Sequence, residues 1–326
     1  MADLTSRYMG IKLENPVIVS ASGLTESEEG ALKAEDSGAG AVVMKSVFEE
    51  QIEIESKTLE DQSLHDHPEW QDYLGVFGRE SSLNNYLDQI EKAKSRTHIP
   101  VFGSVNCTTA YGWTDFAKRL ADTGIDGLEL NVFIAPNDIG KTSEEVEKVY
   151  SDIFSEVKSR VSIPIVMKLP PYLTTPERML RKLAEAGLRG AVLFNRPLPF
   201  DIDIEKRKIT TRNIISSSTE MSYSLRMCSI LAGSCNCDLA VGTGVHDAEA
   251  VIKHLFAGAT VVQLCSVIYL HGFQQVSKII YDLNKWMDEH AIKSVDEIRG
   301  VLSSQNTSYT ALYARTQYLK AFGNFN

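Results

Sequence analysis

Short apolar runs alternate with longer amphipathic segments along the chain, and this alternation predicts the fold. One arrangement recurs four times. A helical segment ends at small residues and glycine, and an apolar run follows at once, within residues 35–46, 120–131, 183–195 and 255–266. Glycine can adopt the left-handed conformation that ends a helix, and it permits a short turn into the next element. Each of these four segments is therefore predicted to lead into a β-strand.

Four further apolar runs have no such glycine turn before them. They cover residues 15–19, 99–103, 164–169 and 239–242, and the first three are entered through proline. Apolar runs without alternation are typical of strands buried on both faces, as in parallel sheets. Amphipathic segments such as 143–161 lie between the strands and predict helices. This pattern predicts an α/β fold, a (β/α)8 TIM barrel, and leaves an open doubly wound sheet as the alternative.

Three stretches do not follow the repeat. Residues 47–83 are polar with a few aromatic side chains, and residues 197–220 are charged with isoleucines spaced among the polar groups. Both follow predicted strands, so we expect them to lie over the carboxyl-terminal face of the barrel as lids or hairpins. The tail from about residue 294 is predicted to be helical and to pack outside the barrel. We expect residues 1–326 to form a single domain.

Composition narrows the class of protein. The 326 residues are 43% hydrophobic and carry a net charge of −10, which argues against a nucleic-acid groove and against binding to anionic membranes. No apolar run is long enough to span a bilayer, and the first residues lack a signal-peptide pattern. The five scattered cysteines suggest reduced thiols in a cytoplasmic protein. Cys235-Asn236-Cys237 has no companion ligands nearby, so we expect no metal site.

Polar side chains stand at the ends of several predicted strands. Lys168 closes an apolar run just before a double proline, and Lys45, Asn106, Asn131 and Asn195 occupy similar positions. In α/β barrels the carboxyl ends of the strands carry the functional residues. A solvated rim, with a lysine that snorkels to the surface, is the alternative interpretation. Cationic and amide groups that converge on a cavity suit a flat ligand rich in oxygen and nitrogen whose reduced form is an anion.

The last two predicted strands are followed by small residues. Gly242-Thr243-Gly244 precedes the start of a predicted helix, and Cys265-Ser266 follows the final strand. Barrels commonly build a phosphate site at this place from backbone N–H groups and a helix N-terminus. Gly-x-Gly alone also occurs where the chain packs tightly, but its position in the repeat favours phosphate.

Together these residues resemble a known family. The chain is similar to the dihydroorotate dehydrogenases, in particular the soluble class 1 enzymes, from about Tyr8 to Ile292. The motifs that carry the resemblance are Ala21-Ser22-Gly23, Lys45-Ser46, Glu129-Leu130-Asn131, Val166-Met167-Lys168-Leu169-Pro170-Pro171 and Gly242-Thr243-Gly244. The resemblance implies a (β/α)8 barrel with FMN at the strand carboxyl ends. It also implies oxidation of dihydroorotate to orotate in pyrimidine biosynthesis, with hydride passing to the flavin, and a homodimer.

The resemblance assigns roles to individual residues. Lys168 would face the N1/C2 edge of the flavin, where a cation favours the anionic reduced form. Lys45 would lie between flavin and substrate, and with Asn131 and Asn195 it makes up the catalytic set. The expected FMN-binding residues are Ala21, Ser22, Gly23, Lys45, Ser46, Asn131, Lys168, Asn195, Gly242, Thr243, Gly244, Cys265 and Ser266.

The expected catalytic base is missing. The family has a cysteine or serine before a proline in the loop after the fourth strand, whereas this chain has Ala135 there, in a loop one residue longer. Alanine cannot accept a proton, and loss of a general base costs about 10²–10⁴ in rate. We therefore expect weak or absent turnover of dihydroorotate. His67, Cys107 and Thr142 are the alternative bases.

Other departures also affect the substrate side. His65-Asp66-His67 replaces the family's substrate-binding asparagine, Arg196 follows Asn195 in place of serine, and Ser216-Ser217-Ser218 stands where the family has glycines near the phosphate. One alternative function is thus an FMN barrel reductase for another enone or a pyrimidine-like substrate, with Arg196 binding a carboxylate or carbonyl. A barrel that binds a phosphate compound without redox chemistry is the other.

Overall fold

The computed structural model describes residues 2–54, 68–134, 140–197 and 199–306. Eight parallel strands form a closed ring, in which β4 pairs with β3 on one side and with β6 on the other. This closure confirms the predicted TIM barrel over the open sheet. The strands of the ring, in chain order, are β3 (Val17–Val19), β4 (Ala41–Val43), β6 (Val101–Asn106), β7 (Gly127–Asn131), β8 (Ile165–Leu169), β9 (Gly190–Leu193), β12 (Asp238–Val241) and β13 (Val261–Leu264). A two-residue strand, β5 (Val47–Phe48), pairs with the end of β6.

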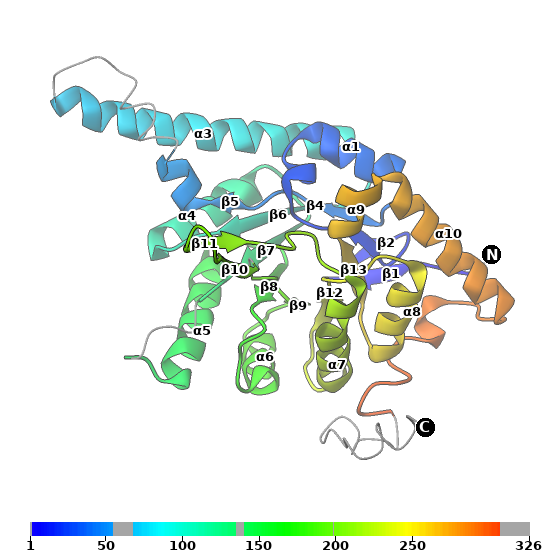
Figure 1. Cartoon of the computed structure of the whole chain (residues 1–326). Coiled ribbons are helices and arrows are strands. Elements are labelled where there is room, and N and C mark those ends of the chain that lie inside the picture. Colours follow the sequence, from blue (N-terminus) through cyan, green and yellow to red (C-terminus); the bar gives the residue numbers. More distant parts are fainter. Residues whose placement is uncertain (1, 55–67, 135–139, 198, 307–326) are drawn as a thin grey trace.

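Helices surround the ring, as Figure 1 shows. They are α1 (Glu28–Asp36), α3 (Pro68–Arg96), α4 (Ala110–Asp122), α5 (Ser143–Arg160), α6 (Pro176–Glu185), α7 (Met221–Leu231), α8 (Ala248–Ala257), α9 (Ser266–His271) and α10 (Gln274–Glu289). Single 3₁₀ turns lie at η1 (Gly23–Thr25), η2 (Ser218–Glu220) and η3 (Val295–Glu297). None of the helices within the described ranges is both long and apolar enough to cross a membrane.

The four glycines predicted to end helices do so with left-handed backbone. Their φ angles are +80° at Gly38, +81° at Gly124, +104° at Gly187 and +110° at Gly258. A residue with a side chain adopts this conformation only at a cost, and glycine adopts it freely. Each glycine lets the chain leave its helix and enter the adjoining strand within a few residues, which keeps the repeat compact.

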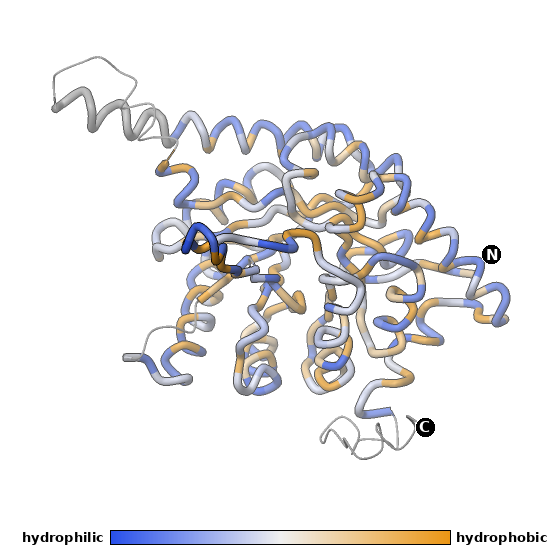
Figure 2. Tube along the Cα trace, viewed as in Figure 1, coloured by the Kyte–Doolittle hydropathy of each residue, from blue (hydrophilic) through white to orange (hydrophobic). Residues whose placement is uncertain are grey.

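A short hairpin closes the amino-terminal end of the barrel. Its strands β1 (Ser6–Tyr8) and β2 (Ile11–Leu13) pair antiparallel, and Tyr8 and Leu13 are each 1% exposed. They pack against apolar side chains inside the barrel such as Phe102 and Val166. Figure 2 shows the apolar character of the strands against the polar outer faces of the helices. Since this end is filled, the opposite end is the one that can admit a ligand.

The lid or hairpin expected for residues 47–83 is wrong for the described part of that stretch. Residues 49–54 are helical, and Pro68–Arg96 forms one helix, α3, which packs beside α1 (Figure 1). The buried positions Leu83, Ile90 and Ala93 follow helical spacing. The barrel helix therefore begins well before the amphipathic pattern becomes visible in the sequence.

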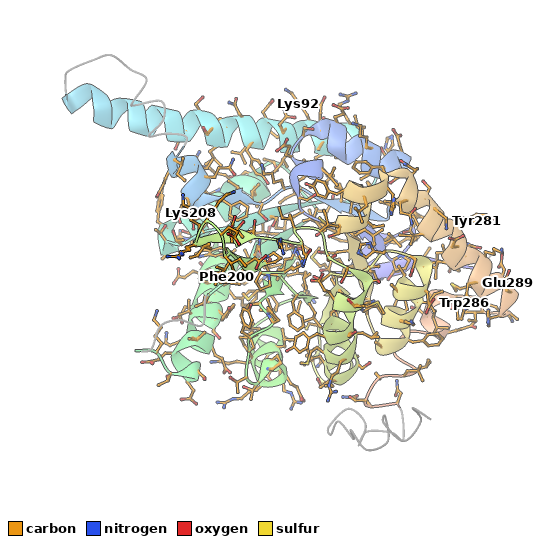
Figure 3. The ribbon with its side chains drawn as sticks, in the orientation of Figure 1. Lys92, Phe200, Lys208, Tyr281, Trp286 and Glu289 are labelled. Carbon is orange, nitrogen blue, oxygen red and sulfur yellow. The ribbon has the colours of Figure 1, made fainter. Side chains whose placement is uncertain are left out.

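Residues 197–220 contain the expected hairpin. Strands β10 (Phe200–Asp203) and β11 (Lys208–Thr211) pair antiparallel, and Figure 3 labels Phe200 and Lys208 on them. Pro199 and Ile214, which flank the hairpin, line a cavity at the strand ends. The hairpin thus rises from the rim of that cavity.

The helix expected from residue 294 is wrong for the described residues. Residues 294–306 contain a single bridge from Ser294 to Asp3, the 3₁₀ turn η3 and further turns and bends, but no α-helix. Gly300 has a φ of +72°, which interrupts any continuous helix. Residues 307–326 lie outside the described part of the chain.

Candidate active site

A cavity lies at the carboxyl ends of five adjacent strands, β3, β8, β9, β12 and β13. Its volume is ≈ 280 Å³, close to the lower end of the range of about 300–1,000 Å³ for small-molecule pockets. Eight of the thirteen residues expected to bind FMN line it. These eight are Ala21, Lys168, Asn195, Gly242, Thr243, Gly244, Cys265 and Ser266. They come from segments spread over the whole chain, and the barrel brings them together.

A buried polar layer lies under the cavity. The Lys168 ammonium is 3.4 Å from Glu129 Oε1, and Glu129 is only 1% exposed. The other oxygen of Glu129 accepts a hydrogen bond from Gln263 Nε2 at 2.9 Å, and Gln263 Oε1 accepts one from the Ser20 hydroxyl at 3.1 Å. These bonds cross the barrel from β7 to β13. They satisfy the buried groups and hold the ammonium at the floor of the cavity.

The two catalytic asparagines of the expected set contact each other. Asn195 donates from Nδ2 to Asn131 Oδ1 at 2.8 Å. Asn131 is 8% exposed and pairs with Lys168 in the register of β7 and β8. Asn195 follows β9 and lines the cavity, whereas Asn131 supports it from behind. Both amides keep further donors or acceptors that can face a ligand.

Hydroxyl and backbone groups gather where β12 and β13 end. The Ser216 hydroxyl donates to Ser266 Oγ at 2.9 Å, and the Ser216 backbone N–H donates to the same oxygen at 3.1 Å. The backbone N–H of Gly244 donates to Ser216 Oγ at 3.1 Å. This cluster of N–H and O–H groups, which contains no carboxylate, is the chemistry that a phosphate needs.

The turn after β12 passes very close to the backbone at the start of α7. Thr243 and Gly244 both have left-handed backbone, with φ of +65° and +76°. A Cβ at Gly244 would lie 2.6 Å from the backbone nitrogen of Met221 and 2.9 Å from the Ser217 carbonyl oxygen. The turn therefore abuts the start of α7, and only glycine fits there.

The segment after β3 continues the cavity wall. Ala21 and Cys265 both line the cavity. Burial raises the pKa of Cys265 above its ordinary value, against smaller opposing effects of Lys168 and Ser22. Cys265 is thus a neutral thiol at physiological pH. Ser22 also caps η1, and a Cβ at Gly23 would approach the Tyr269 hydroxyl to 3.0 Å.

Five expected residues are not among those that line the cavity: Ser22, Gly23, Lys45, Ser46 and Asn131. Two of them, Lys45 and Ser46, are held elsewhere. The Lys45 ammonium contacts Glu26 Oε2 at 3.0 Å, and Ser46 shares a 2.7 Å hydrogen bond with Ser104 in a buried position. Both residues follow β4, which pairs with β3 but is not one of the five strands whose ends form the cavity. In this structure they are held by protein partners.

Arg196 lines the cavity, but its guanidinium is engaged by the protein. It donates from Nε to Glu220 Oε2, and from Nη1 and Nη2 to the carbonyl oxygens of Ile214 and Asn213, each at 2.7 Å. Nη2 also contacts Glu220 Oε1 at 3.3 Å. The clamp for a substrate carboxylate that the sequence suggested would have to give up these bonds.

The alternative bases have little support from the described residues. Thr142 caps α5, where its hydroxyl and Glu145 form a reciprocal capping box. Cys107 is 7% exposed and packs in the hydrophobic core between barrel and helices. Ala135 and His67 lie outside the described residues. Among the residues that are described, no three His, Cys, Asp or Glu side chains come together to hold a metal ion.

Glu129 and Gln263 belong to the site although neither was expected there from the sequence. Glu129 had a signal, since Leu128-Glu129-Leu130-Asn131 alternates in polarity while the other strands of the ring are nearly all apolar. A carboxylate at 1% exposure in such a strand needs a cation, and Lys168 is that cation. Gln263 had the same kind of signal, as a polar residue in the apolar strand Val261-Val262-Gln263-Leu264, but nothing local indicates its partner, which lies 134 positions away.

The closed barrel with a polar cavity at its strand ends defines an α/β-barrel enzyme site. The family model described as dihydroorotate dehydrogenase matches residues 3–287. The chain therefore belongs to the dihydroorotate dehydrogenase family, whose members are oxidoreductases acting on CH–CH groups.

Individual relatives agree with this assignment. The chain is 26% identical over 315 residues to the dihydroorotate dehydrogenase B (NAD(+)) catalytic subunit of Thermoplasma acidophilum, covering 92% of this chain and 99% of that protein. It is 24% identical to the corresponding subunit of Methanocaldococcus jannaschii, over 91% of this chain and 97% of that protein. It is also 21% identical to the chloroplastic dihydropyrimidine dehydrogenase (NADP(+)) of Arabidopsis thaliana, over 96% of this chain and 80% of that protein.

A solved structure supports the fold. The crystal structure of DHODH from Eimeria tenella in complex with ferulenol aligns with a TM-score of 0.64 at 15% sequence identity. The alignment covers 92% of this chain and 88% of that chain. At this identity the likeness concerns the barrel architecture.

Proposed function

We propose that the chain is an FMN-dependent oxidoreductase that resembles dihydroorotate dehydrogenase but turns over dihydroorotate slowly. The observation that carries this proposal is one cavity at the ends of five strands. It joins a lysine, an asparagine and a glycine turn that the family resemblance assigns to the flavin, namely Lys168, Asn195 and Gly242-Thr243-Gly244. Residues so far apart in sequence form one lining only because each follows a barrel strand.

The donor set of the cavity fits a flavin mononucleotide. At one end the N–H of Gly244 and the hydroxyls of Ser216 and Ser266 lie within hydrogen-bond distance of each other and can turn toward a phosphate. The close contact between Gly244 and the start of α7 keeps this end narrow. At the other end Lys168 offers a cation from the floor. Phosphate donors and a buried cation within one cavity match the phosphate of the cofactor and the ring edge that becomes negative on reduction.

Bound FMN would supply the group that accepts hydride from the substrate. Lys168 would stabilise negative charge at the N1/C2 edge of the reduced ring, since a nearby cation favours an anion. Glu129 and Gln263 would fix the position of that lysine. Asn195, braced by Asn131, would orient the polar edge of the ring or of the substrate. Ala21, Ser22, Gly23 and Cys265 would lie along the ring, and Lys45 and Ser46 would approach it from the end of β4.

The proposed weakness toward dihydroorotate depends on Ala135. A base in this loop would remove the C5 proton of dihydroorotate, and without one the rate should fall about 10²–10⁴-fold. The test is the anaerobic rate of flavin bleaching by dihydroorotate in the wild-type protein and in Ala135→Cys and Ala135→Ser. Slow wild-type bleaching that either variant accelerates supports the proposal. Fast wild-type bleaching contradicts it and indicates another base.

A second candidate is a flavin reductase for another pyrimidine-like or enone substrate. The similarity over nearly the whole chain to a plant protein named dihydropyrimidine dehydrogenase favours a pyrimidine ring. A screen that follows oxidation of reduced flavin by pyrimidines and enones separates the two candidates. A protein that binds no flavin at all would instead support the barrel that binds a phosphate compound without redox chemistry.

Three further expectations remain predictions. We propose a homodimer, a cytoplasmic location and a single-domain organisation of residues 1–326. Light scattering of the purified protein measures the first. Limited proteolysis with mass spectrometry tests the third, because a second independent domain would survive as a separate fragment.

A further inference from the structure

We infer that Arg196 is a positioning residue that holds the phosphate end of the cavity in place. This inference rests on the proposed function, since it concerns the cofactor phosphate. Arg196 follows β9, and its side chain turns toward the loop that leads from the hairpin to α7. Its four hydrogen bonds go to Glu220, Ile214 and Asn213, with three of them at 2.7 Å.

The arginine binds two backbone carbonyls and a carboxylate at once. The Nε and Nη2 groups face Glu220 as a fork, and Nη1 and Nη2 reach the carbonyl oxygens of Ile214 and Asn213. Only the planar guanidinium can make this set of bonds, because lysine has a single point of donation. Asn213 takes a left-handed conformation with φ of +54°, so its carbonyl is presented by a turn that asparagine tolerates.

Glu220 extends the connection to the first turn of α7. Its Oε1 accepts the backbone N–H of Ser217 at 2.7 Å, and the two residues form a capping box for η2. Burial alone would raise the pKa of Glu220, but hydrogen bonds from Arg196 and Ser217 hold it below the ordinary value. The carboxylate therefore stays charged, and the pair is only 20% and 35% exposed at its side chains.

Ser216 lies between these two anchors. The carbonyl of Ile214 is fixed two residues before it, and Ser217 is fixed directly after it. Ser216 in turn bonds Ser266 at the end of β13 and Gly244 at the end of β12. Arg196 thus connects the end of β9 to the loop whose Ser216 gathers the proposed phosphate donors. Without the arginine the loop loses the contacts that keep Ser216 over that site.

Arg196 acts here through the loop. If Arg196 acts in this way, its loss should weaken the binding of a ligand that carries a phosphate more than the binding of one that does not. A general loss of folding would weaken both equally. FMN and riboflavin share the ring and differ in the phosphate, so the ratio of their dissociation constants isolates the phosphate end. Flavin fluorescence quenching gives both constants on the same protein.

The experiment compares Arg196→Ala with Arg212→Ala in the full chain. Arg212 is the matched control, since its side chain is 79% exposed and its ion pair with Asp201 lies on the neighbouring hairpin. In the wild type we expect FMN to bind more tightly than riboflavin. Arg196→Ala should weaken the binding of FMN by about 10- to 100-fold and the binding of riboflavin by less than about 3-fold. The loss for FMN has the size expected for hydrogen bonds to a charged group. Arg212→Ala should leave both constants unchanged.

A second variant tests the same contact in case Arg196→Ala does not fold. Glu220→Gln keeps the shape but removes the charge that Arg196 contacts, and it should shift FMN affinity in the same direction by a smaller factor. Thermal unfolding shows whether each variant is folded. The inference would be overturned if Arg196→Ala left the affinity for FMN unchanged. It would also be overturned if Arg196→Ala and Glu220→Gln weakened the binding of FMN and of riboflavin equally. A wild-type protein that binds neither flavin would overturn the proposed function itself.

Discussion

The two sides of the barrel rim differ in what their residues contact. We call the ends of β3, β8, β9, β12 and β13 the cavity side, and the ends of β4, β6 and β7 the opposite side. Residues expected at the site on the cavity side line one cavity, as Lys168 and Asn195 do. On the opposite side Lys45 and Ser46 are held by Glu26 and Ser104. Most of the residues expected to bind the cofactor lie on the first side, whereas the missing base falls on the second, at Ala135 after β7.

This difference suggests that the two halves of the site have separate constraints. A cofactor stays bound in every turnover and needs fixed donors, so the cavity side is built on strand ends with buried partners. A substrate can change with the loops that touch it, and the loops after β4 and β7 differ from the family pattern. The comparison can be tested by perturbing each side in turn.

The largest effect is expected from Lys168→Met. It leaves the Glu129 carboxylate buried at 1% exposure without its cation, and loss of one partner of a buried pair costs about 3–5 kcal/mol. FMN binding should be lost as well. Urea unfolding and flavin titration measure the two effects. The double variant Lys168→Met with Glu129→Gln should regain most of the stability but none of the FMN affinity. If Lys168→Met alone were as stable as the wild type, Lys168 and Glu129 would not stabilise each other.

Acid should lower the stability of the fold through His254 before it acts through Glu49. His254 on α8 is fully buried, and burial lowers its pKa from 6.5 to about 4. Between pH 6.5 and about 4, His254 is protonated in the unfolded chain but not in the folded one. The free energy of unfolding therefore keeps its full value above pH 6.5 and falls as the pH drops toward 4. The loss is on the order of 3 kcal/mol at most. His254→Gln should flatten this part of the curve of unfolding free energy against pH. An unchanged slope would rule out His254 as its cause.

Glu49 provides the contrast on the opposite side. Burial opposes its charge, but hydrogen bonds from Thr109 and Thr108 hold its pKa below the ordinary 4.5. Glu49 therefore contributes to the free energy of unfolding above pH 4.5. This contribution is lost only as the pH falls through the lowered pKa of Glu49 in the folded protein. Glu49→Gln should change the unfolding curve in that more acidic window and leave the window from pH 6.5 to about 4.5 as in the wild type.

A smaller effect is expected from Gly244→Ala. The new Cβ would collide with the backbone of Met221 at 2.6 Å and would sit at a φ of +76°. We expect a loss of about 2 kcal/mol together with weaker FMN binding, because the phosphate end must widen. Gly124→Ala is the control, since its φ is +81° but no atom lies within 4 Å of the added Cβ. Equal losses of stability in the two variants would mean that the close approach has no role.

The smallest effect is expected from Lys45→Ala. Its ion pair with Glu26 is partly exposed, at 30% and 58% of the side chains, and such pairs contribute about 0–1 kcal/mol. FMN affinity should change by less than about 3-fold, while flavin reduction by substrate should slow. A loss of FMN as large as in Lys168→Met would place the opposite side in the cofactor site and break the comparison.

Much of this arrangement could be predicted from the sequence. The glycine turns at Gly38, Gly124, Gly187 and Gly258 and the uninterrupted apolar runs are local signals, and they sufficed for the eight strands. The position of Lys168 at a strand end placed it in the cavity for the same reason. A strand-end position was not sufficient by itself, since Lys45 and Ser46 follow β4 and do not line the cavity.

The remainder depends on contacts between distant segments. Nothing local in the sequence shows that Gln263 reaches Glu129, or that Arg196 turns to Asn213 and Glu220. The start of α3 was missed because its first residues mix polar, aromatic and glycine residues without a helical period, which appears only later in the helix. Partners across the barrel are set by its closure, which sequence patterns do not encode residue by residue.

The most direct test is the visible absorption spectrum of the protein loaded with FMN, recorded before and after anaerobic addition of dihydroorotate. We predict a bound-flavin band that bleaches only slowly, because the cavity side binds the cofactor and Ala135 supplies no base. Rapid bleaching would contradict the account of the opposite side. A protein that retains no flavin would contradict the central claim that the cavity holds FMN.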